Sequence, residues 1–192
     1  MRRVLALPLV LAALALTGCS PDYVMPADQR SRPVSVDAQL AYVERHWQEP
    51  NTAEWGDLGG TDCVNFTSQS LHARGWPMTE EWGSVRVDGR NTYAPAWVSS
   101  TAMRDWLATQ PDLAQAVEDD ARNRLAVGDV AQFDWDRSGD RDHTVVVTGV
   151  RQTASGTEVL VTGHSPAYRD KPVDELLEEH PGAAVHYWHL LR

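Results

Sequence analysis

Hydrophobic residues recur at helical spacing in the first half of the chain. Leu40, Val43 and Trp47 lie three or four residues apart, which predicts a helix that begins near Ser35 and ends before Pro50. The Ser35 side chain can accept a hydrogen bond from the free backbone N–H groups of the first turn. The glycine-rich stretch that follows this helix is expected to be a loop.

A second helix is predicted over residues 62–74. Thr61 or Asp62 can cap its first turn, and Gly75 can adopt the left-handed conformation that often follows a last turn. Residues 76–98 are rich in aromatic side chains without a regular period, and we expect them to be irregular. A third helix is predicted over 99–109. A shorter fourth helix is predicted to begin at Pro111, with Leu113 and Val117 facing inward.

The hydrophobic period changes after Gly128, where apolar and polar residues begin to alternate. Strands are predicted near residues 130–135, 144–150, 159–161 and 184–191. Helices that precede antiparallel strands predict an α+β domain.

The N-terminus has the pattern of a secretory signal peptide, with a basic start and a short apolar run over residues 1–18. The run is shorter than the roughly 20 apolar residues that cross a bilayer. The Leu-Thr-Gly-Cys sequence that ends at Cys19 resembles a bacterial lipobox, whose cysteine is lipidated and becomes the new N-terminus. The alternative is an ordinary signal peptide with a chance cysteine.

The lipobox predicts a three-part chain. A removed leader would be followed by a flexible tether over residues 19–34 and a domain over 35–192. The protein is therefore expected on the extracytoplasmic face of a bacterial cell membrane, held there only by its N-terminal lipid.

Charge limits the classes of partner. The chain has 17 Lys and Arg against 27 Asp and Glu, a net charge of −10. Loss of Arg2 and Arg3 with the leader would leave 15 against 27, or −12. So acidic a chain repels phosphate backbones, and we expect no nucleic-acid partner.

Cys63 is left without a partner if Cys19 carries lipid, because the chain has two cysteines. Cys63 falls in the first turn of the predicted second helix, where free N–H groups and the helix dipole favour a thiolate. The same N–H groups could bind the oxyanion of a tetrahedral intermediate. Cys63 is therefore a candidate nucleophile; the alternative is a small buried apolar residue.

His143 begins the predicted central strand and is a candidate base. A hairpin centred near Thr153 and Ala154 would set His143 opposite His164, to within one residue. Side chains at such positions are close enough to touch. His164 could then hold the His143 ring by a hydrogen bond, as the third member of a triad does. The alternative is that His164 ends its strand at the surface.

Four polar residues near these positions could support them. Asp62 and Asn65 flank Cys63, Gln69 lies one turn beyond Asn65, and Asp142 precedes His143. For Asp62 a capping function is expected. For Asn65 and Gln69 we favour structural hydrogen bonds over catalysis, although both could line a cleft.

An acidic segment near residue 136 partly resembles a calcium loop. Its oxygen-bearing residues are Asp134, Asp136, Ser138 and Asp140. Val145 stands at the twelfth position, where such loops need a bidentate glutamate, so a tight acidic turn is the preferred interpretation. One available thiol does not suit zinc, and no metal or cofactor is predicted.

The irregular region contains Trp76, Trp82 and Trp97, which could form the wall of a groove for a glycan or a peptide. Burial in the core is the preferred interpretation for each of them.

Several motifs together resemble the Putative amidase domain family of bacteria, over roughly residues 38–191. They are GGTDCVNFTSQ (59–69), GWPM (75–78), AWV (96–98), GDV (128–130), FDWD (133–136), DH (142–143), GHSP (163–166) and YWHL (187–190). That family is similar to papain-like cysteine peptidases of the bacterial cell-wall type. The sequence departs from it at Ala167, where an acidic residue is expected.

The resemblance implies a helix with the nucleophile packed on an antiparallel sheet with the histidine. It implies Cys63 as the nucleophile, His143 as the general base and then acid, and His164 as the polar third residue. We therefore predict a lipid-anchored cysteine hydrolase that cleaves an amide bond through an acyl-enzyme. Peptidoglycan stem peptides are the nearest amide substrate at that location. A catalytically inactive binding module and an amine acyltransferase are the alternatives.

Overall fold

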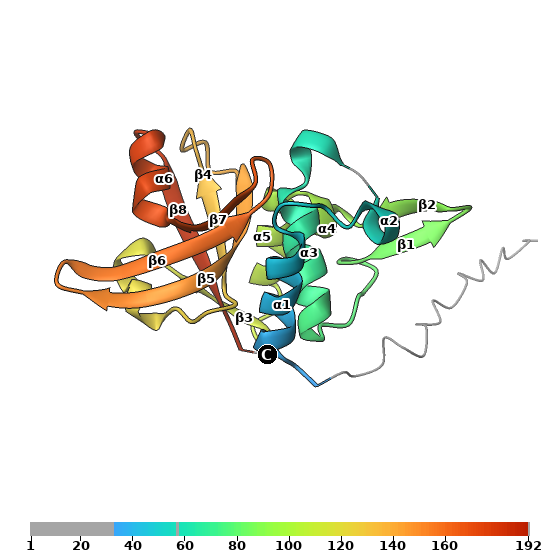
Figure 1. Ribbon diagram of the computed structural model, residues 1–192, viewed down its shortest axis with the longest axis horizontal. Helices are drawn as coiled ribbons and strands as arrows, with labels where there is room; N and C mark the ends of the chain where they lie inside the picture. Colours follow the sequence, from blue (N-terminus) through green and yellow to red (C-terminus); the bar gives the residue numbers. More distant parts are fainter. Residues whose placement is uncertain (1–32, 57, 192) are drawn as a thin grey trace, which may run out of the picture.

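The structure, a computed structural model, describes residues 33–56 and 58–191. Helices mainly precede an antiparallel sheet, which confirms the predicted α+β class (Figure 1). None of the helices in these ranges is both long and apolar enough to cross a bilayer. The predicted leader, Cys19 and most of the tether lie outside the described residues.

The helical elements are α1 (Val36–His46), α2 (Thr52–Trp55), the 3₁₀ turn η2 (Gly59–Thr61), α3 (Cys63–Arg74), α4 (Pro95–Val98), α5 (Ser100–Ala108), the 3₁₀ turn η3 (Asp119–Arg124) and α6 (Val173–Glu179). The strands are β1 (Ser84–Val87), β2 (Arg90–Tyr93), β3 (Ala114–Val117), β4 (Val130–Asp134), β5 (His143–Thr153), β6 (Gly156–Gly163), β7 (Tyr168–Pro172) and β8 (Ala184–Leu190). The strands β3-β8-β4-β5-β6-β7 form one sheet in that order, in which every neighbouring pair is antiparallel.

The start of α1 and the end of α3 fall where local chemistry predicts. The Ser35 side chain accepts a hydrogen bond from the backbone N–H of Ala38 at 3.1 Å and caps α1. Gly75 follows α3 with φ of 111°, a conformation that side chains disfavour, and its N–H bonds the carbonyl of His72. Both predictions are confirmed.

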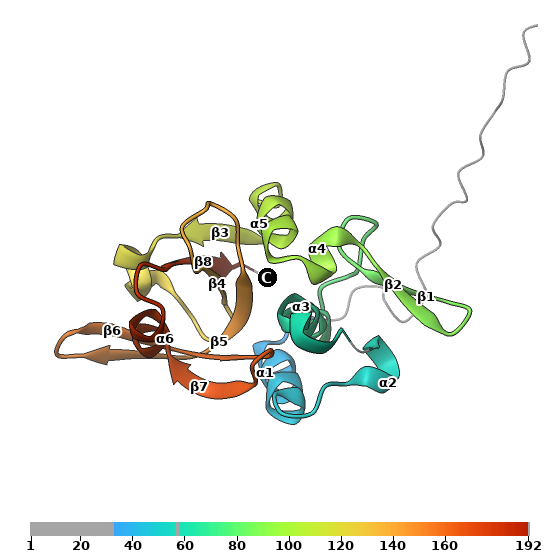
Figure 2. The same ribbon diagram turned by 90° about the horizontal axis from the view of Figure 1, so that it is seen from above.

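The two faces of the sheet pack against different helices. Along β5, Val145 and Val147 pack into a core that includes Leu176 of α6. Val146 points to the opposite face, where it packs with Phe66 of α3. Seen from above, α3 and α6 accordingly lie on different sides of β5 (Figure 2). The face on which a β5 residue lies therefore decides which helix it meets.

Six of the eight tryptophans lie in one core cluster around α3, α4 and α5: Trp55, Trp76, Trp82, Trp97, Trp106 and Trp188. Trp82 stacks on Trp106 with ring centroids 5.2 Å apart. The preferred interpretation of Trp76, Trp82 and Trp97 as core residues is confirmed, since each is at most 2% exposed. They form no groove wall.

The predicted helix after Pro111 is wrong. Residues 114–117 form β3 instead, which pairs with β8, and a 3₁₀ turn follows. Pairing with a buried strand outweighs the helical spacing of so short a segment. The region expected to be irregular contains the hairpin β1–β2, whose turn residues Asp88 and Gly89 both have positive φ. Asp-Gly is a hairpin signal that the aromatic residues around it obscured.

Candidate active site

Cys63 is the first residue of α3, and it is 8% exposed. The predicted cap of this helix is wrong. Asp62 stands at the N-cap position but makes no capping hydrogen bond, because its carboxylate binds Asn65 and His164 instead. The Thr61 hydroxyl donates to the carbonyl of Leu58. Asp62 therefore connects elements rather than terminating one.

Burial changes the expected state of the Cys63 thiol. Desolvation raises its pKa above the usual value, although hydrogen bonds from the Thr144 backbone, the Ser100 side chain and the Val64 backbone act in the opposite direction. The predicted thiolate is therefore corrected: desolvation outweighs the helix N-terminus, and the resting side chain is a thiol at neutral pH.

Cys63 lies against the beginning of β5. Its sulfur accepts the hydrogen bond from the backbone of Thr144, the residue after His143. Ser100 Oγ lies 3.9 Å from Cys63 Sγ and accepts a hydrogen bond of 2.9 Å from Thr144 Oγ1. Within the described residues Cys63 and His143 share no hydrogen bond, but the helix start and the strand start meet at this point.

His143 is buried and held by a tyrosine. Its Nε2 lies 2.9 Å from the hydroxyl oxygen of Tyr168, the first residue of β7. Desolvation, aided by His180, lowers the pKa of His143 to about 4. A general base is expected to have a pKa near neutrality, and this expectation is corrected downward: the imidazole is neutral and able to accept a proton at pH 7.

His164 lies on the other face of the sheet. The register pairs Val146 with Thr162, and continuing it would place His143 beside Ser165, within the predicted tolerance of one residue. A shift of one residue moves a side chain to the opposite face. His164 stacks on Phe66 of α3 with ring centroids 4.0 Å apart, and it makes no hydrogen bond to His143.

Both ring nitrogens of His164 face oxygen atoms that can only accept. Nδ1 lies 2.9 Å from Asp62 Oδ2, and Nε2 lies 2.6 Å from the carbonyl oxygen of His46 at the end of α1. Nε2 therefore donates to the carbonyl, and the contact of Nδ1 with Asp62 Oδ2 is a salt bridge when the ring is doubly protonated. Asp62 and His164 form a buried charge pair directly beside Cys63, and the predicted hydrogen bond from His164 to His143 is wrong.

The other predicted supporting residues make structural contacts. Asn65 donates to Asp62 at 2.8 Å and accepts from the indole of Trp97 at 2.9 Å. Gln69 accepts a hydrogen bond of 2.5 Å from the Tyr42 hydroxyl. These bonds use the polar groups of both side chains inside the protein, as the structural interpretation predicts.

A small pocket of about 160 Å³ opens beside His143, at the end of the sheet where β5 begins. His143 and Tyr168 form part of its wall, and Trp135 and Leu176 supply apolar surface. Trp135 stacks on His180 with ring centroids 4.3 Å apart. A substrate group that enters this pocket would therefore contact the imidazole directly.

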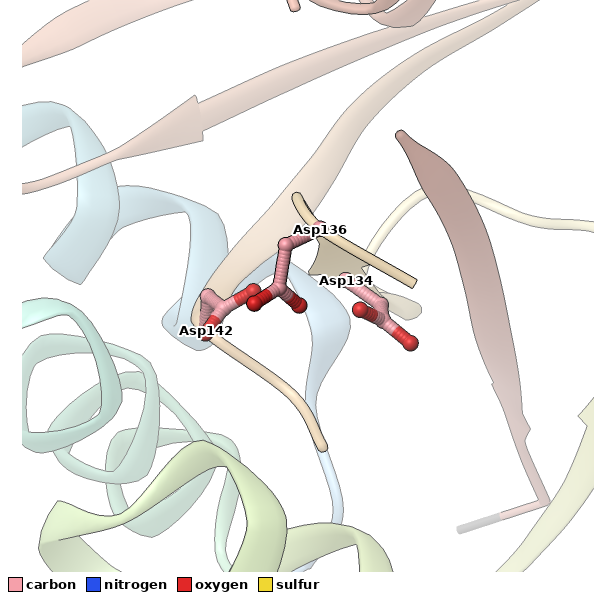
Figure 3. Close-up of side chains that lie close together, drawn as sticks. All are labelled: Asp134, Asp136 and Asp142. Carbon is pink, nitrogen blue, oxygen red and sulfur yellow. The ribbon is translucent and has the colours of Figure 1, made fainter. Parts of the chain in front are cut away.

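The acidic segment before β5 forms a turn that its own carboxylates stabilise. Among the described residues Asp134, Asp136 and Asp142 have oxygen atoms within 4.8 Å of one another (Figure 3). Asp134 and Asp136 both accept hydrogen bonds of 3.0 Å from the N–H of Ser138, and Asp142 accepts one of 2.7 Å from Trp135. These bonds agree with the tight acidic turn.

Sequence reasoning missed two residues of the site. Ser100 lies at the start of the predicted third helix, and no local pattern indicates its contact with Cys63. Tyr168 lies in a short polar strand, Tyr-Arg-Asp-Lys-Pro, that has no alternating pattern. The neighbouring GHSP motif, already identified as part of the resemblance, was the signal that could have directed attention to Tyr168.

We expect His164→Ala to lower the free energy of unfolding by about 3–5 kcal/mol, because the buried Asp62 carboxylate loses its partner. Urea unfolding followed by circular dichroism measures the change. The double variant Asp62→Asn/His164→Ala should be more stable than the single variant, since no charge remains unpaired. A single variant within about 0.5 kcal/mol of wild type would refute the charge pair.

We expect Cys63 to react with iodoacetamide more slowly than a small thiol at every pH up to 9, because burial raises its pKa. The rate should rise with pH and show an inflection above that of glutathione titrated in parallel. Mass spectrometry of the alkylated protein identifies the site. An inflection below pH 8 would contradict this prediction and indicate a thiolate formed before substrate binds.

The sequence was compared with known proteins. The family model described as "Putative amidase domain" matches residues 34–188. The "Uncharacterized protein YhbB" of Bacillus subtilis (strain 168) is 30% identical over 112 residues, which are 56% of this chain and 35% of that protein. The comparison with solved structures gave no significant match. The chain belongs to the Putative amidase domain family, whose description indicates amide hydrolysis.

Proposed function

We propose that the protein is a cysteine-dependent amide hydrolase, with Cys63 as the nucleophile and His143 as the base. The observation that carries this proposal is the contact between the start of α3 and the start of β5. There the Cys63 sulfur bonds the backbone of the residue next to His143, in a chain of the Putative amidase domain family. A nucleophile at a helix start beside a strand-borne histidine is also the arrangement of papain-like enzymes, and we propose this fold for the domain.

The resting site holds a thiol and a neutral imidazole, which suits general-base catalysis. Cys63 would exchange its contact with Ser100 for one with His143, give its proton to the imidazole and form a bond to the amide carbonyl carbon. The free N–H groups at the start of α3 would stabilise the oxyanion. His143 would then protonate the departing amine as the C–N bond breaks.

Hydrolysis completes the cycle. Water would give a proton to His143 as its oxygen bonds the acyl carbon, and the thiol would leave when that proton returns to the sulfur. His143 therefore begins and ends each half of the reaction neutral, which its lowered pKa favours. No step needs a metal or a cofactor.

We propose further that the enzyme acts at the outer face of a bacterial membrane, anchored through a lipid on Cys19. The lipobox-like sequence and the signal-peptide pattern support this location. Peptides of the cell wall are the amides nearest to such a site, so peptidoglycan stem peptides are the proposed substrate class.

One observation favours a second function. Cys63 is buried and its thiol pKa is raised, as expected for a cysteine without chemistry. A domain that binds cell-wall peptides and hydrolyses none of them would have such a residue. Transfer of the acyl group to an amine in place of water is the remaining alternative, and it requires the same two residues.

We expect Cys63→Ser and His143→Gln to keep the fold and to lower kcat/KM for amide hydrolysis by about 10³-fold or more. His186→Gln, at a partly exposed histidine of the same sheet, is the matched control and should retain activity. Release of amines from solubilised peptidoglycan fragments and short peptide amides measures turnover, and circular dichroism measures folding.

The pH profile and an added amine extend this experiment. Because the base must be neutral, kcat/KM should fall with decreasing pH only near pH 4, where His143 becomes protonated. Acceleration by glycine methyl ester, with a new amide as the product, would identify acyl transfer. If the wild type cleaves none of these amides yet binds the fragments, the binding module is the correct function.

We expect the protein expressed in a bacterium with lipoprotein processing to start at a lipid-modified Cys19 and to fractionate with membranes. Cys19→Ser should release it into the soluble fraction, because a single acylated residue provides the attachment. Cys63→Ser is the control and should remain bound. Mass spectrometry of the mature N-terminus decides the matter: any other N-terminal residue would overturn the anchor.

A further inference from the structure

Tyr168 takes the position next to His143 that the sequence assigned to His164. We propose that Tyr168 is the positioning residue of the catalytic histidine, holding the His143 ring by its Nε2 so that Nδ1 faces Cys63. This inference rests on the proposed function, because it assigns the residue that orients the base. Its direct observation is the 2.9 Å contact between Tyr168 Oη and His143 Nε2.

The phenol is suited to this task because it stays protonated. Burial, and then the nearby Cys63 sulfur, raise the pKa of Tyr168 far above its usual value. A neutral hydroxyl can accept a hydrogen bond from Nε2–H. When Nε2 is the donor in this contact, Nδ1 keeps the free lone pair that a thiol proton needs, and this is the tautomer that the proposal requires. It also accepts from the imidazolium that forms during the reaction.

Strand pairing between β6 and β7 places Tyr168 next to His143. Tyr168 pairs with Gly163 across β6 and β7, and Gly163 lies beside His143 on the neighbouring strand. A Cβ atom at Gly163 would come within 2.5 Å of Val145 Cγ1 and 3.7 Å of His143 Nε2. The missing side chain therefore leaves the space in which the histidine and tyrosine meet.

No other described polar group is placed to orient the ring in this way. His164 has both ring nitrogens occupied on the opposite face of the sheet. The carboxylate of Asp142 is exposed and accepts from the backbone of Trp135. His180, which faces the same pocket, lowers the pKa of His143 but has its Nδ1 at the carbonyl of Leu176.

The other charged side chains near the His143 ring are paired with one another. Lys171 and Glu179 share the pocket with His143 and bind each other at 2.6 Å. Glu175 lies 3.3 Å from the same ammonium group. Cys63, Tyr168, His180, Lys171 and Glu179 are therefore the titratable groups that a pH profile of His143 must consider. Tyr168 alone among them contacts a ring nitrogen.

The test removes one oxygen atom. We expect Tyr168→Phe to lower kcat by about 10- to 100-fold with little change in KM, because a poorly held base reacts less often. Tyr187→Phe is the matched control: Tyr187 is a buried residue on β8 of the same sheet whose hydroxyl is bound to Asp119 at 3.0 Å and not to His143, and loss of this hydroxyl should leave kcat unchanged.

A spectroscopic measurement makes the test independent of turnover. The ¹⁵N chemical shifts of the His143 ring, assigned by their loss in His143→Gln, report which nitrogen carries the proton. Wild type should show the Nε2–H tautomer at pH 7, Tyr168→Phe should show a mixture, and Tyr187→Phe should match wild type. An unchanged tautomer in Tyr168→Phe, or an unchanged kcat, would overturn the inference.

The two proposals fail in different ways. If Cys63→Ser keeps full activity, the proposed hydrolase mechanism is wrong, whatever the tyrosine does. If Cys63→Ser is inactive while Tyr168→Phe retains wild-type kcat and tautomer, the mechanism stands and only the assignment of Tyr168 is wrong.

Discussion

The buried pair of Asp62 and His164 is the interaction on which the rest of the site depends. Asp62 precedes Cys63, the proposed nucleophile, and His164 follows β6 and reaches the last carbonyl of α1 through its second nitrogen. Three segments that are distant in the sequence thus meet at two side chains. A buried carboxylate without this partner would be costly, so the pair discourages any arrangement in which α3 moves away from the sheet.

The pair also sets the electrostatics beside Cys63. Alone, the Asp62 carboxylate would oppose a thiolate on the next residue, and it contributes in that direction to the raised pKa of Cys63. The partner of this carboxylate is His164, whose Nδ1 lies 2.9 Å from Asp62 Oδ2. Desolvation is the largest influence on the pKa of both Cys63 and His143. It keeps the thiol protonated and the imidazole neutral. Such a site would create charges only during the reaction.

The sequence predicts those features that depend on residues close together along the chain, and it fails for those that depend on distant residues. Ser35 and Gly75 act on neighbouring backbone groups, so the start of α1 and the end of α3 are visible locally. The partner of His143 depends on strand register, where an uncertainty of one residue selects between two faces. Tyr168 lies in an edge strand whose pattern is too short and too polar to indicate its burial.

The bond from His164 to the carbonyl of His46 gives the first helix of the domain a second purpose. The end of α1 is part of the support beneath Cys63, and Gln39 of the same helix donates to the carbonyl of Gly128 before β4. The chain therefore cannot be shortened into α1 without loosening the support beneath Cys63. Proteolytic cleavage that leaves this support intact would have to occur ahead of Ser35.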